Sequence, residues 1–205
     1  MTPYSPLQKA ALWMGGWLGL MVIIAVAGRE ALRELSVFQL MELRSLIGML
    51  MLWPLVHAAG GLPAMRTMRL KQHLLRNAVH YAAQYGWMAA LLLIPLAQVV
   101  AIEFTMPIWA ALLALAFLGE RLSIAKVLAI VLGLAGVWVI VRPAQTGLNP
   151  GQLIALVAAV GFAVSVVLVK AITRTDAAVV VSFWMLVVQS AIGLVPAVLL
   201  WRWPS

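Results

Sequence analysis

The sequence predicts an all-α polytopic membrane protein, in which several apolar helices cross a lipid bilayer. Hydrophobic residues make up 65% of the 205-residue chain and charged residues only 10%, and the mean hydropathy is +1.06. Soluble domains carry about 25% charged residues and about half apolar ones. A water-soluble fold of this length could not bury so much apolar surface, so lipid must cover part of it.

Seven apolar runs predict about seven transmembrane helices. A crossing takes about 20 mostly apolar residues, and the runs are continuous, without the period-2 alternation of membrane β-strands. Helices also satisfy their own backbone polar groups inside lipid. The predicted spans are residues 10–27, 37–57, 73–93, 97–118, 124–141, 151–171 and 178–201.

The first run, residues 10–27, has a second interpretation as a cleaved signal peptide. It follows Lys9 and ends in Ala25-Val26-Ala27, a pattern that also fits a cleavage site. A leader is normally followed by a polar mature chain, whereas further apolar spans follow this run. We therefore favour a first transmembrane helix.

The basic residues predict the orientation in the membrane, because positive charge concentrates in cytoplasmic segments. A cytoplasmic N-terminus places most of the 14 lysines and arginines on that side, namely Lys9, Arg66, Arg69, Lys71, Arg76, Arg121, Lys126, Lys170 and Arg174. Four others, Arg29, Arg33, Arg142 and Arg202, then lie outside. The N-terminus is therefore expected inside and the C-terminus, after seven spans, outside.

Composition excludes several function classes. Although the net charge is +8, the basic residues punctuate apolar runs and form no basic face, which argues against nucleic-acid binding. The chain has no cysteine, and its three histidines form no HExxH motif, so thiolate and zinc sites are not expected. No nucleophile–base pair at useful spacing is visible, so neither enzyme activity nor a cofactor is predicted.

The stretch from Gln98 to Pro143 predicts two spans joined by one charged turn, Gly119-Glu120-Arg121-Leu122-Ser123. Its first span carries Glu103 roughly 9 Å from the outer end and Pro107 four residues later. A proline inside a helix removes its own donor and displaces the carbonyl at i−4, which here belongs to Glu103. We expect a helix kink at a substrate site, as in the broken helices of transporters. A routine kink beside a buried acid is the alternative.

Arg44, in the second span, lies at a depth similar to Glu103. Polar groups inside lipid are costly and tend to mark pathways. Arg44 is expected either to pair with Glu103, which lowers the burial cost of both, or to extend along its own helix toward the membrane surface.

The third span carries one polar face, formed by Asn77, His80, Tyr81 and Gln84. Counting back from the Ile94-Pro95-Leu96 turn places Trp87 level with Glu103 and Gln84 level with Met106, so Gln84 is a better partner for Glu103 than His80. A purely structural hydrogen-bond network is the alternative. The predicted substrate-binding set is Glu103, Arg44, Gln84, His80, Tyr81, Trp87, Met106 and Pro107.

Small residues at intervals of four predict close helix packing in the sixth span. Gly151, Ala155, Ala159 and Ala163 lie on one stripe, and such stripes let helix backbones approach closely in lipid.

The pattern AIEFTMPIWAALLALAFLGERLS, followed by a glycine-rich span and GVWVIVRP, resembles the EamA-type repeat of the drug/metabolite transporter superfamily. Residues 1–142 resemble one five-helix repeat, residues 143–150 a linker, and residues 151–205 the first two helices of a second, inverted repeat. The resemblance implies a multi-pass secondary transporter of the cell inner membrane that moves a small organic metabolite or drug. Its central cavity is expected between spans 1–4 and 6, with proton coupling at Glu103 left open.

The chain departs from that pattern, because the third, fourth and fifth helices of the second repeat are absent. We expect a truncated product or a fragment of a ten-helix protein. A homodimer or the missing C-terminal helices would then complete the transport path. The alternative is a non-transporting membrane subunit or remnant that needs a partner chain.

Overall fold

The computed structural model describes residues 5–119, 123–141 and 149–203, and in these ranges the chain is helical apart from short connections. The helices are α1 (Pro6–Ala31), α2 (Val37–Ala58), α3 (Leu70–Leu93), α4 (Leu96–Glu103), α5 (Met106–Leu118), α6 (Ile124–Val141), α8 (Pro150–Ile172) and α9 (Ala178–Leu199). A 3-10 turn, η1 (Leu62–Met65), lies between α2 and α3. Each predicted span is occupied by a helix, and α4 and α5 together fill the fourth.

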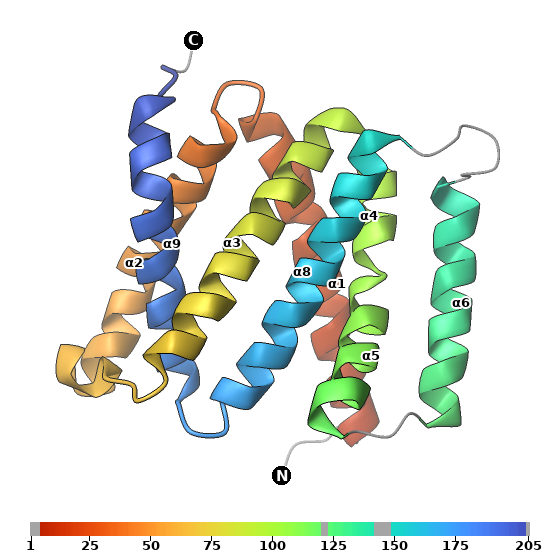
Figure 1. The fold of residues 1–205 in the computed structure, drawn as a ribbon, viewed down its shortest axis with the longest axis horizontal. Coiled ribbons are helices and arrows are strands. Elements are labelled where there is room, and N and C mark those ends of the chain that lie inside the picture. The colour runs from red at the N-terminus through yellow and green to blue at the C-terminus, as the bar shows by residue number, and fades with distance from the viewer. Residues whose placement is uncertain (1–4, 120–122, 142–148, 204–205) are drawn as a thin grey trace.

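The helices run up and down the bundle, and α1 begins at the opposite end from the one at which α9 ends (Figure 1). Six described helices are long and apolar enough to cross a membrane, with α4 and α5 taken as one. The exception is α3, whose polar residues include Arg76, Asn77, His80 and Gln84. It nevertheless runs the height of the bundle between α8 and α9 (Figure 1). The predicted fold class, an all-α polytopic membrane protein, is confirmed.

Capping residues fix where several helices begin. Ser5 and Ser36 each accept a hydrogen bond from the backbone three residues on, and the glutamine at that position reaches back to the cap. Asn149 and Gln152 form the same reciprocal arrangement at the start of α8. Such capping boxes satisfy backbone donors that the first helical turn leaves free.

Helices α3 and α8 form the closest packed pair of the bundle centre. A Cβ atom placed on Gly161 of α8 would lie 2.8 Å from the Cβ of Ala83 on α3, so glycine is needed for this approach. The predicted stripe of small residues in α8 is buried: Gly151, Ala155, Ala159 and Ala163. Close packing of this kind replaces the hydrophobic drive that lipid does not supply.

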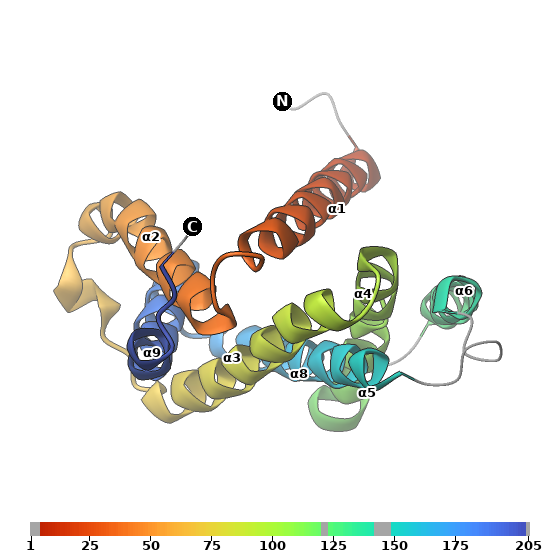
Figure 2. The same cartoon turned by 90° about the horizontal axis from the view of Figure 1, so that it is seen from above.

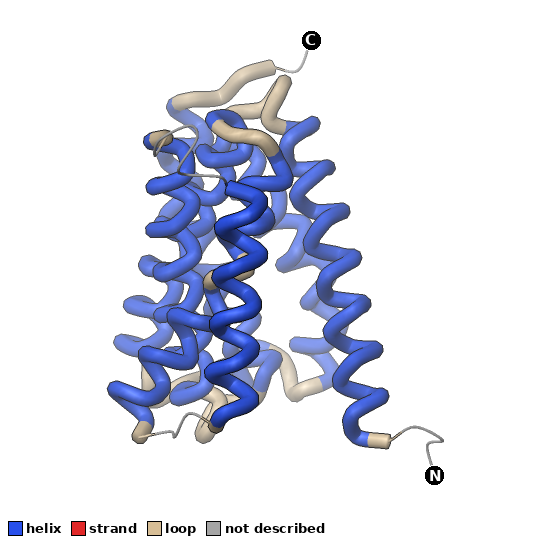
Figure 3. The backbone as a smooth tube through the Cα atoms, turned by 90° about the vertical axis from the view of Figure 1, so that its right-hand side faces the viewer, coloured by secondary structure: helices blue, strands red, loops and turns tan. Residues whose placement is uncertain are grey.

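Two helices stand at the margins of the bundle. Figure 2 shows α6 at the edge beyond α5 and α8, and α1 set apart from α3 and α4. Figure 3 shows α1 leaning away from the other helices toward its N-terminal end. Most side chains of α6 are exposed, as expected for a helix that faces lipid.

Two predicted connections lie partly outside the described residues. Helix α5 ends at Leu118 and is capped by Gly119, whose φ of +67° is left-handed, but residues 120–122 of the charged turn are not described. Of the predicted linker 143–150, only Asn149 and Pro150 are described.

Candidate functional site

A cavity of about 310 Å³ lies among α1, α2, α3, α4 and α8. Its wall on α1 consists of Trp17, Leu20, Met21 and Ile24. Five of the predicted site residues line it, and its walls are otherwise apolar or aromatic. The lining residues are Trp17, Leu20, Met21, Ile24, Arg44, His80, Gln84, Trp87, Met88, Glu103 and Phe162.

Arg44 is the cationic group of this cavity. Its Nη2 donates hydrogen bonds to Oε1 of Gln84 on α3, at 2.6 Å, and to Oε1 of Gln189 on α9, at 2.8 Å. Both amides are buried, so α3 and α9 each fix one end of the guanidinium through the same terminal nitrogen. Arg44 therefore faces the cavity instead of extending to the membrane surface.

Glu103 is the anionic group, and it lies at the last residue of α4. The helix is interrupted at Phe104 and Thr105 and resumes as α5, with Pro107 in its first turn. Proline is tolerated at that position because the first turn leaves its backbone donors free in any case. The interruption thus places the Glu103 carboxyl at a helix end that opens on the cavity.

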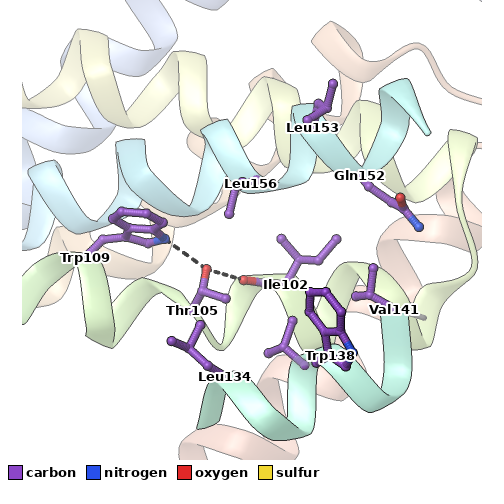
Figure 4. Close-up of a pocket in the computed structure, with 10 residues that line it drawn as sticks. Ile102, Thr105, Trp109, Leu134, Trp138, Val141, Gln152, Leu153 and Leu156 are labelled. Atoms are coloured by element: carbon purple, nitrogen blue, oxygen red, sulfur yellow. Dashed lines mark hydrogen bonds between the residues drawn. The ribbon is translucent and has the colours of Figure 1, made fainter. Parts of the chain in front are cut away.

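A threonine stabilises the interruption. Thr105 Oγ1 donates to the Ile102 carbonyl at 2.7 Å and accepts from Trp109 Nε1 at 3.1 Å (Figure 4). The Thr105 carbonyl also accepts from the backbone N–H groups of Ile108 and Trp109. These bonds satisfy groups that would otherwise be left free where the helix breaks.

Glu103 and Arg44 form no ion pair. The Trp87 indole lies against the Glu103 carboxyl, as the register of the α3–α4 turn predicts. Neither the Trp87 N–H nor Glu103 Oε2 has a hydrogen-bond partner of standard geometry, and both atoms are buried. The expected pairing of Arg44 with Glu103 is therefore wrong for this structure, and so is Gln84 as the partner of Glu103, because Gln84 binds Arg44.

His80 lines the cavity one turn below Gln84. Its Nδ1 lies 3.1 Å from Ser165 Oγ of α8, and its ring meets the Phe162 ring edge-on, with centroids 5.2 Å apart. His80 is therefore held between α3 and α8, with its ring on the cavity wall.

Three predicted residues lie elsewhere. Tyr81 is buried on the side of α3 that faces α9, because its hydroxyl packs against Gly193. Pro107 is exposed and lines a separate hollow between α5 and α6, and Met106 does not line the cavity. The helical period explains the difference: residues one position apart on a helix point about 100° apart.

Sequence reasoning missed Gln189 and Phe162, and it considered Trp17 as a cavity residue without selecting it. Gln189 is fully buried in an apolar span, so the rule that polar groups in lipid mark pathways would have found it. No sequence signal distinguishes Trp17 or Phe162 from residues that face lipid.

A second hollow, of about 410 Å³, lies between α4–α5, α6 and α8 (Figure 4). Its polar groups are few: Thr105, the Trp109 and Trp138 indoles, and Gln152, whose Nε2 donates to Gln98 Oε1 at 3.1 Å. It holds no charged group, whereas the first cavity holds a guanidinium, a carboxyl and an imidazole. The first cavity is therefore the candidate site.

The cavity is equipped for binding. It offers a cation, an acid, a neutral amide and aromatic faces, which together can hold a small polar molecule with a planar part. Among the described residues there is no group of three His, Cys, Asp or Glu side chains that could hold a metal ion.

Comparison with known proteins gives matches along most of the chain. The profile of the EamA-like transporter family matches residues 9–142. A riboflavin transporter from Rhizobium johnstonii is 30% identical over 65% of this chain and 44% of its own length, and one from Brucella anthropi is 32% identical over 65% and 47%. An S-adenosylmethionine uptake transporter from Rickettsia felis is 24% identical over 93% and 66%. The chain thus spans about half the length of the first two relatives.

A solved crystal structure has the same fold. It superimposes with a TM-score of 0.67, at 24% sequence identity, over 93% of this chain and 68% of the other chain.

Proposed function

The chain belongs to the EamA-like transporter family, whose members are transporters and not enzymes, and from this premise we propose that it is an inner-membrane secondary transporter of a small organic metabolite or drug. The proposed route runs through the cavity lined by Arg44, His80, Gln84, Trp87 and Glu103. The relatives carry the names of riboflavin and S-adenosylmethionine transporters. Both solutes are small molecules with a planar heterocycle, a class that suits aromatic walls.

One observation carries the proposal. Arg44 and Glu103 line the same cavity inside the bundle and neither neutralises the other. Ionisable side chains in lipid are rare and normally face a pathway or pair with one another. Arg44 is held by neutral amides, so a substrate anion or carbonyl can add to its guanidinium without first breaking an ion pair.

A comparison of cell contents tests the proposal for whichever small solute the protein carries. Cells that overproduce the wild type and Arg44→Gln are compared by mass spectrometry of small solutes. Loss of a charge-assisted hydrogen bond costs about 1.5–3 kcal/mol. The cellular level of the solute that the wild type carries should therefore change at least several-fold less in cells that overproduce Arg44→Gln than in cells that overproduce the wild type. Riboflavin and S-adenosylmethionine are the first probes for uptake.

Arg33→Gln is the matched control. Arg33 is an exposed arginine paired with Glu30 at 2.9 Å near the end of α1, so its loss removes the same charge away from the cavity. Identical solute profiles for wild type, Arg33→Gln and Arg44→Gln contradict the proposed route.

The chain is proposed to form one five-helix repeat, residues 1–142, a linker, 143–150, and the first part of an inverted repeat, 151–205. The equivalent helix starts Ser5-Pro6-Leu7-Gln8 and Asn149-Pro150-Gly151-Gln152 support this division. So do the opposite directions of α1 and α8 (Figure 1).

A second copy of the chain or further helices would complete the proposed transport path. The mass of the detergent-purified assembly tests this, and a functional monomer of this chain alone contradicts it.

A further inference from the structure

Arg76, near the start of α3, is a buried cation that none of the described acids neutralises. It is 7% exposed, and no carboxylate of the described ranges forms an ion pair with it. Its Nη1 donates to Oδ1 of the adjacent Asn77 at 2.6 Å, whereas Nε is buried without a partner. A guanidinium inside a membrane protein is costly to bury and normally pairs with an anion.

An acid at this end of α3, Asp176, is engaged by other donors. Its Oδ2 lies 2.8 Å from His73 Nε2 and accepts from Thr67 Oγ1 at 2.6 Å. Asn77, the partner of Arg76, is a neutral amide. Arg76 is therefore positioned by an amide, as the arginine of the cavity is, and its charge stays available to an added anion.

Arg76 lies on the same side of α3 as two residues of the cavity. Arg76, His80 and Gln84 are spaced by four residues, so they follow one another along one side of the helix, about 6 Å apart. Gln84 binds Arg44, and the charges of Arg44 and Arg76 both act on the His80 imidazole. Two cations with neutral partners thus follow one another from the cavity toward the start of α3.

The start of α3 is the closed end of this line. The cavity lining includes His80 but not Arg76. Trp184 ties α9 to this end of the bundle, because its Nε1 donates to the Met65 carbonyl at 2.9 Å and its carbonyl accepts from Asn77 Nδ2 at 3.1 Å. Transporters open alternately toward the two sides of the membrane, and an opening at this end would uncover Arg76.

We propose that Arg76 is a second anion-binding point, beyond the cavity, and that the transported solute carries a carboxylate or phosphate group. An anion held at Arg44 passes His80 and reaches Arg76 when the closed end opens. The planar guanidinium suits both chemical groups, because it can donate two parallel hydrogen bonds to either. This substrate class rests on the proposed transport function, whereas anion binding at Arg76 is measurable without transport.

Phosphate binding to the full chain, purified in a nonionic detergent, tests the site. Inorganic phosphate is the probe, and its dissociation constant is taken from the rise of the thermal midpoint, since a ligand of the folded state stabilises that state. Every variant carries Arg44→Gln, so that the cation of the cavity does not contribute. Adding Arg76→Gln should weaken phosphate binding about tenfold or more, the effect of losing a charge-assisted hydrogen bond. Arg76→Lys, which keeps the charge, should weaken it less.

Arg66→Gln is the matched control, because Arg66 is an exposed arginine in the connection between α2 and α3; it should leave phosphate binding unchanged. Asn77→Asp is the readout if Arg76→Gln does not fold. Its carboxylate would replace the amide oxygen at Arg76 Nη1 and compete with phosphate, so the rise of the midpoint should be lost.

Phosphate affinity that is unchanged by Arg76→Gln, or by Asn77→Asp where that variant is the readout, overturns the proposal. A midpoint that depends on Arg76 and rises with phosphatidylglycerol but not with phosphate also overturns it, since Arg76 would then bind a lipid headgroup. Transport of an uncharged solute by the wild type contradicts the substrate class and leaves the transport function standing. Phosphate binding that depends on Arg76 in a protein that moves no solute contradicts the transport function and leaves the anion site standing.

Discussion

Arg44 and Glu103 line one cavity without forming an ion pair. Arg44 donates to Gln84 and Gln189, and Glu103 Oε2 is buried without a partner beside Trp87. Both charged groups are therefore positioned by neutral neighbours. A substrate that offers an acceptor to Arg44 and a donor to Glu103 gains two charge-assisted hydrogen bonds, each stronger than a neutral one.

Glu103→Gln is expected to abolish the pH dependence of transport. Glutamine keeps the size and hydrogen-bonding capacity of the side chain but cannot exchange a proton. Solute uptake into proteoliposomes, measured at several pH values with and without a pH gradient, is the readout. Uptake by Glu103→Gln that still follows the pH gradient would exclude Glu103 as the coupling group. Glu30→Gln, which changes an exposed carboxylate, should behave as the wild type.

Gly161→Ala should destabilise the α3–α8 pair. The added methyl would lie 2.8 Å from the Cβ of Ala83, and overpacking of this kind costs typically about 1–3 kcal/mol. Gly133→Ala on α6 is the matched control, because nothing lies within 4 Å of a Cβ there and both changes raise helix propensity equally. Thermal unfolding in detergent should show a lower midpoint for Gly161→Ala. Equal midpoints for the two variants would show that the two helices are not in close contact.

Asp176 joins the α8–α9 turn to the start of α3. Its Oδ2 lies 2.8 Å from His73 Nε2 and accepts from Thr67 Oγ1 at 2.6 Å. Burial raises the pKa of Asp176, but hydrogen bonds from Thr67, His73 and Thr175 and the charge of His73 outweigh burial and leave the pKa below its ordinary value. Such a carboxyl contributes stability that is present above its unfolded pKa and lost as the pH falls through the folded pKa.

Asp176→Asn should therefore lower the thermal midpoint near neutral pH, and the difference from the wild type should shrink below about pH 4, the ordinary Asp range. The measurement is a series of unfolding curves against pH. A constant difference across that range would mean that the ionised carboxyl is not what stabilises the turn. Glu30→Gln provides the comparison with an exposed acid.

Membrane orientation can be read by cysteine labelling, because the chain contains no cysteine. Met68, in the connection between α2 and α3, and Trp203, after α9, are both strongly exposed, and the positive-inside pattern places them on opposite sides. An impermeant thiol reagent added to intact cells should label Trp203→Cys and spare Met68→Cys. The reverse result would invert the proposed orientation.

Sequence reasoning predicts the helices well because the apolar runs are long. The capping boxes Ser36 with Gln39 and Asn149 with Gln152, found in the structure, are local signals that could have sharpened the helix starts, since they need no tertiary information. The depth match of Trp87 with Glu103 was also predictable, since the Ile94-Pro95-Leu96 turn fixes the register of two neighbouring helices.

The side-chain contacts of the candidate site that the sequence does not predict depend on packing between helices that are distant in the chain. Gln189 reaches Arg44 across 145 positions, and no periodicity within one span indicates such a contact. Tyr81 shares a polar face with His80 and Gln84 in sequence, yet α9 covers Tyr81 while the cavity receives the other two. Helix rotation decides these cases, and it is set by contacts such as Gly161 against Ala83 and Gly193 against Tyr81.

The most direct test of the transport route uses two cysteines on α1. Leu20 lines the cavity and Leu12 does not, although both side chains are 61% exposed. Leu20→Cys and Leu12→Cys are treated with a bulky thiol reagent, and flux of the solute that the wild type carries is measured in proteoliposomes. Modification should block flux through Leu20→Cys and leave Leu12→Cys unaffected. Undiminished flux through fully modified Leu20→Cys would contradict the claim that substrate passes through this cavity.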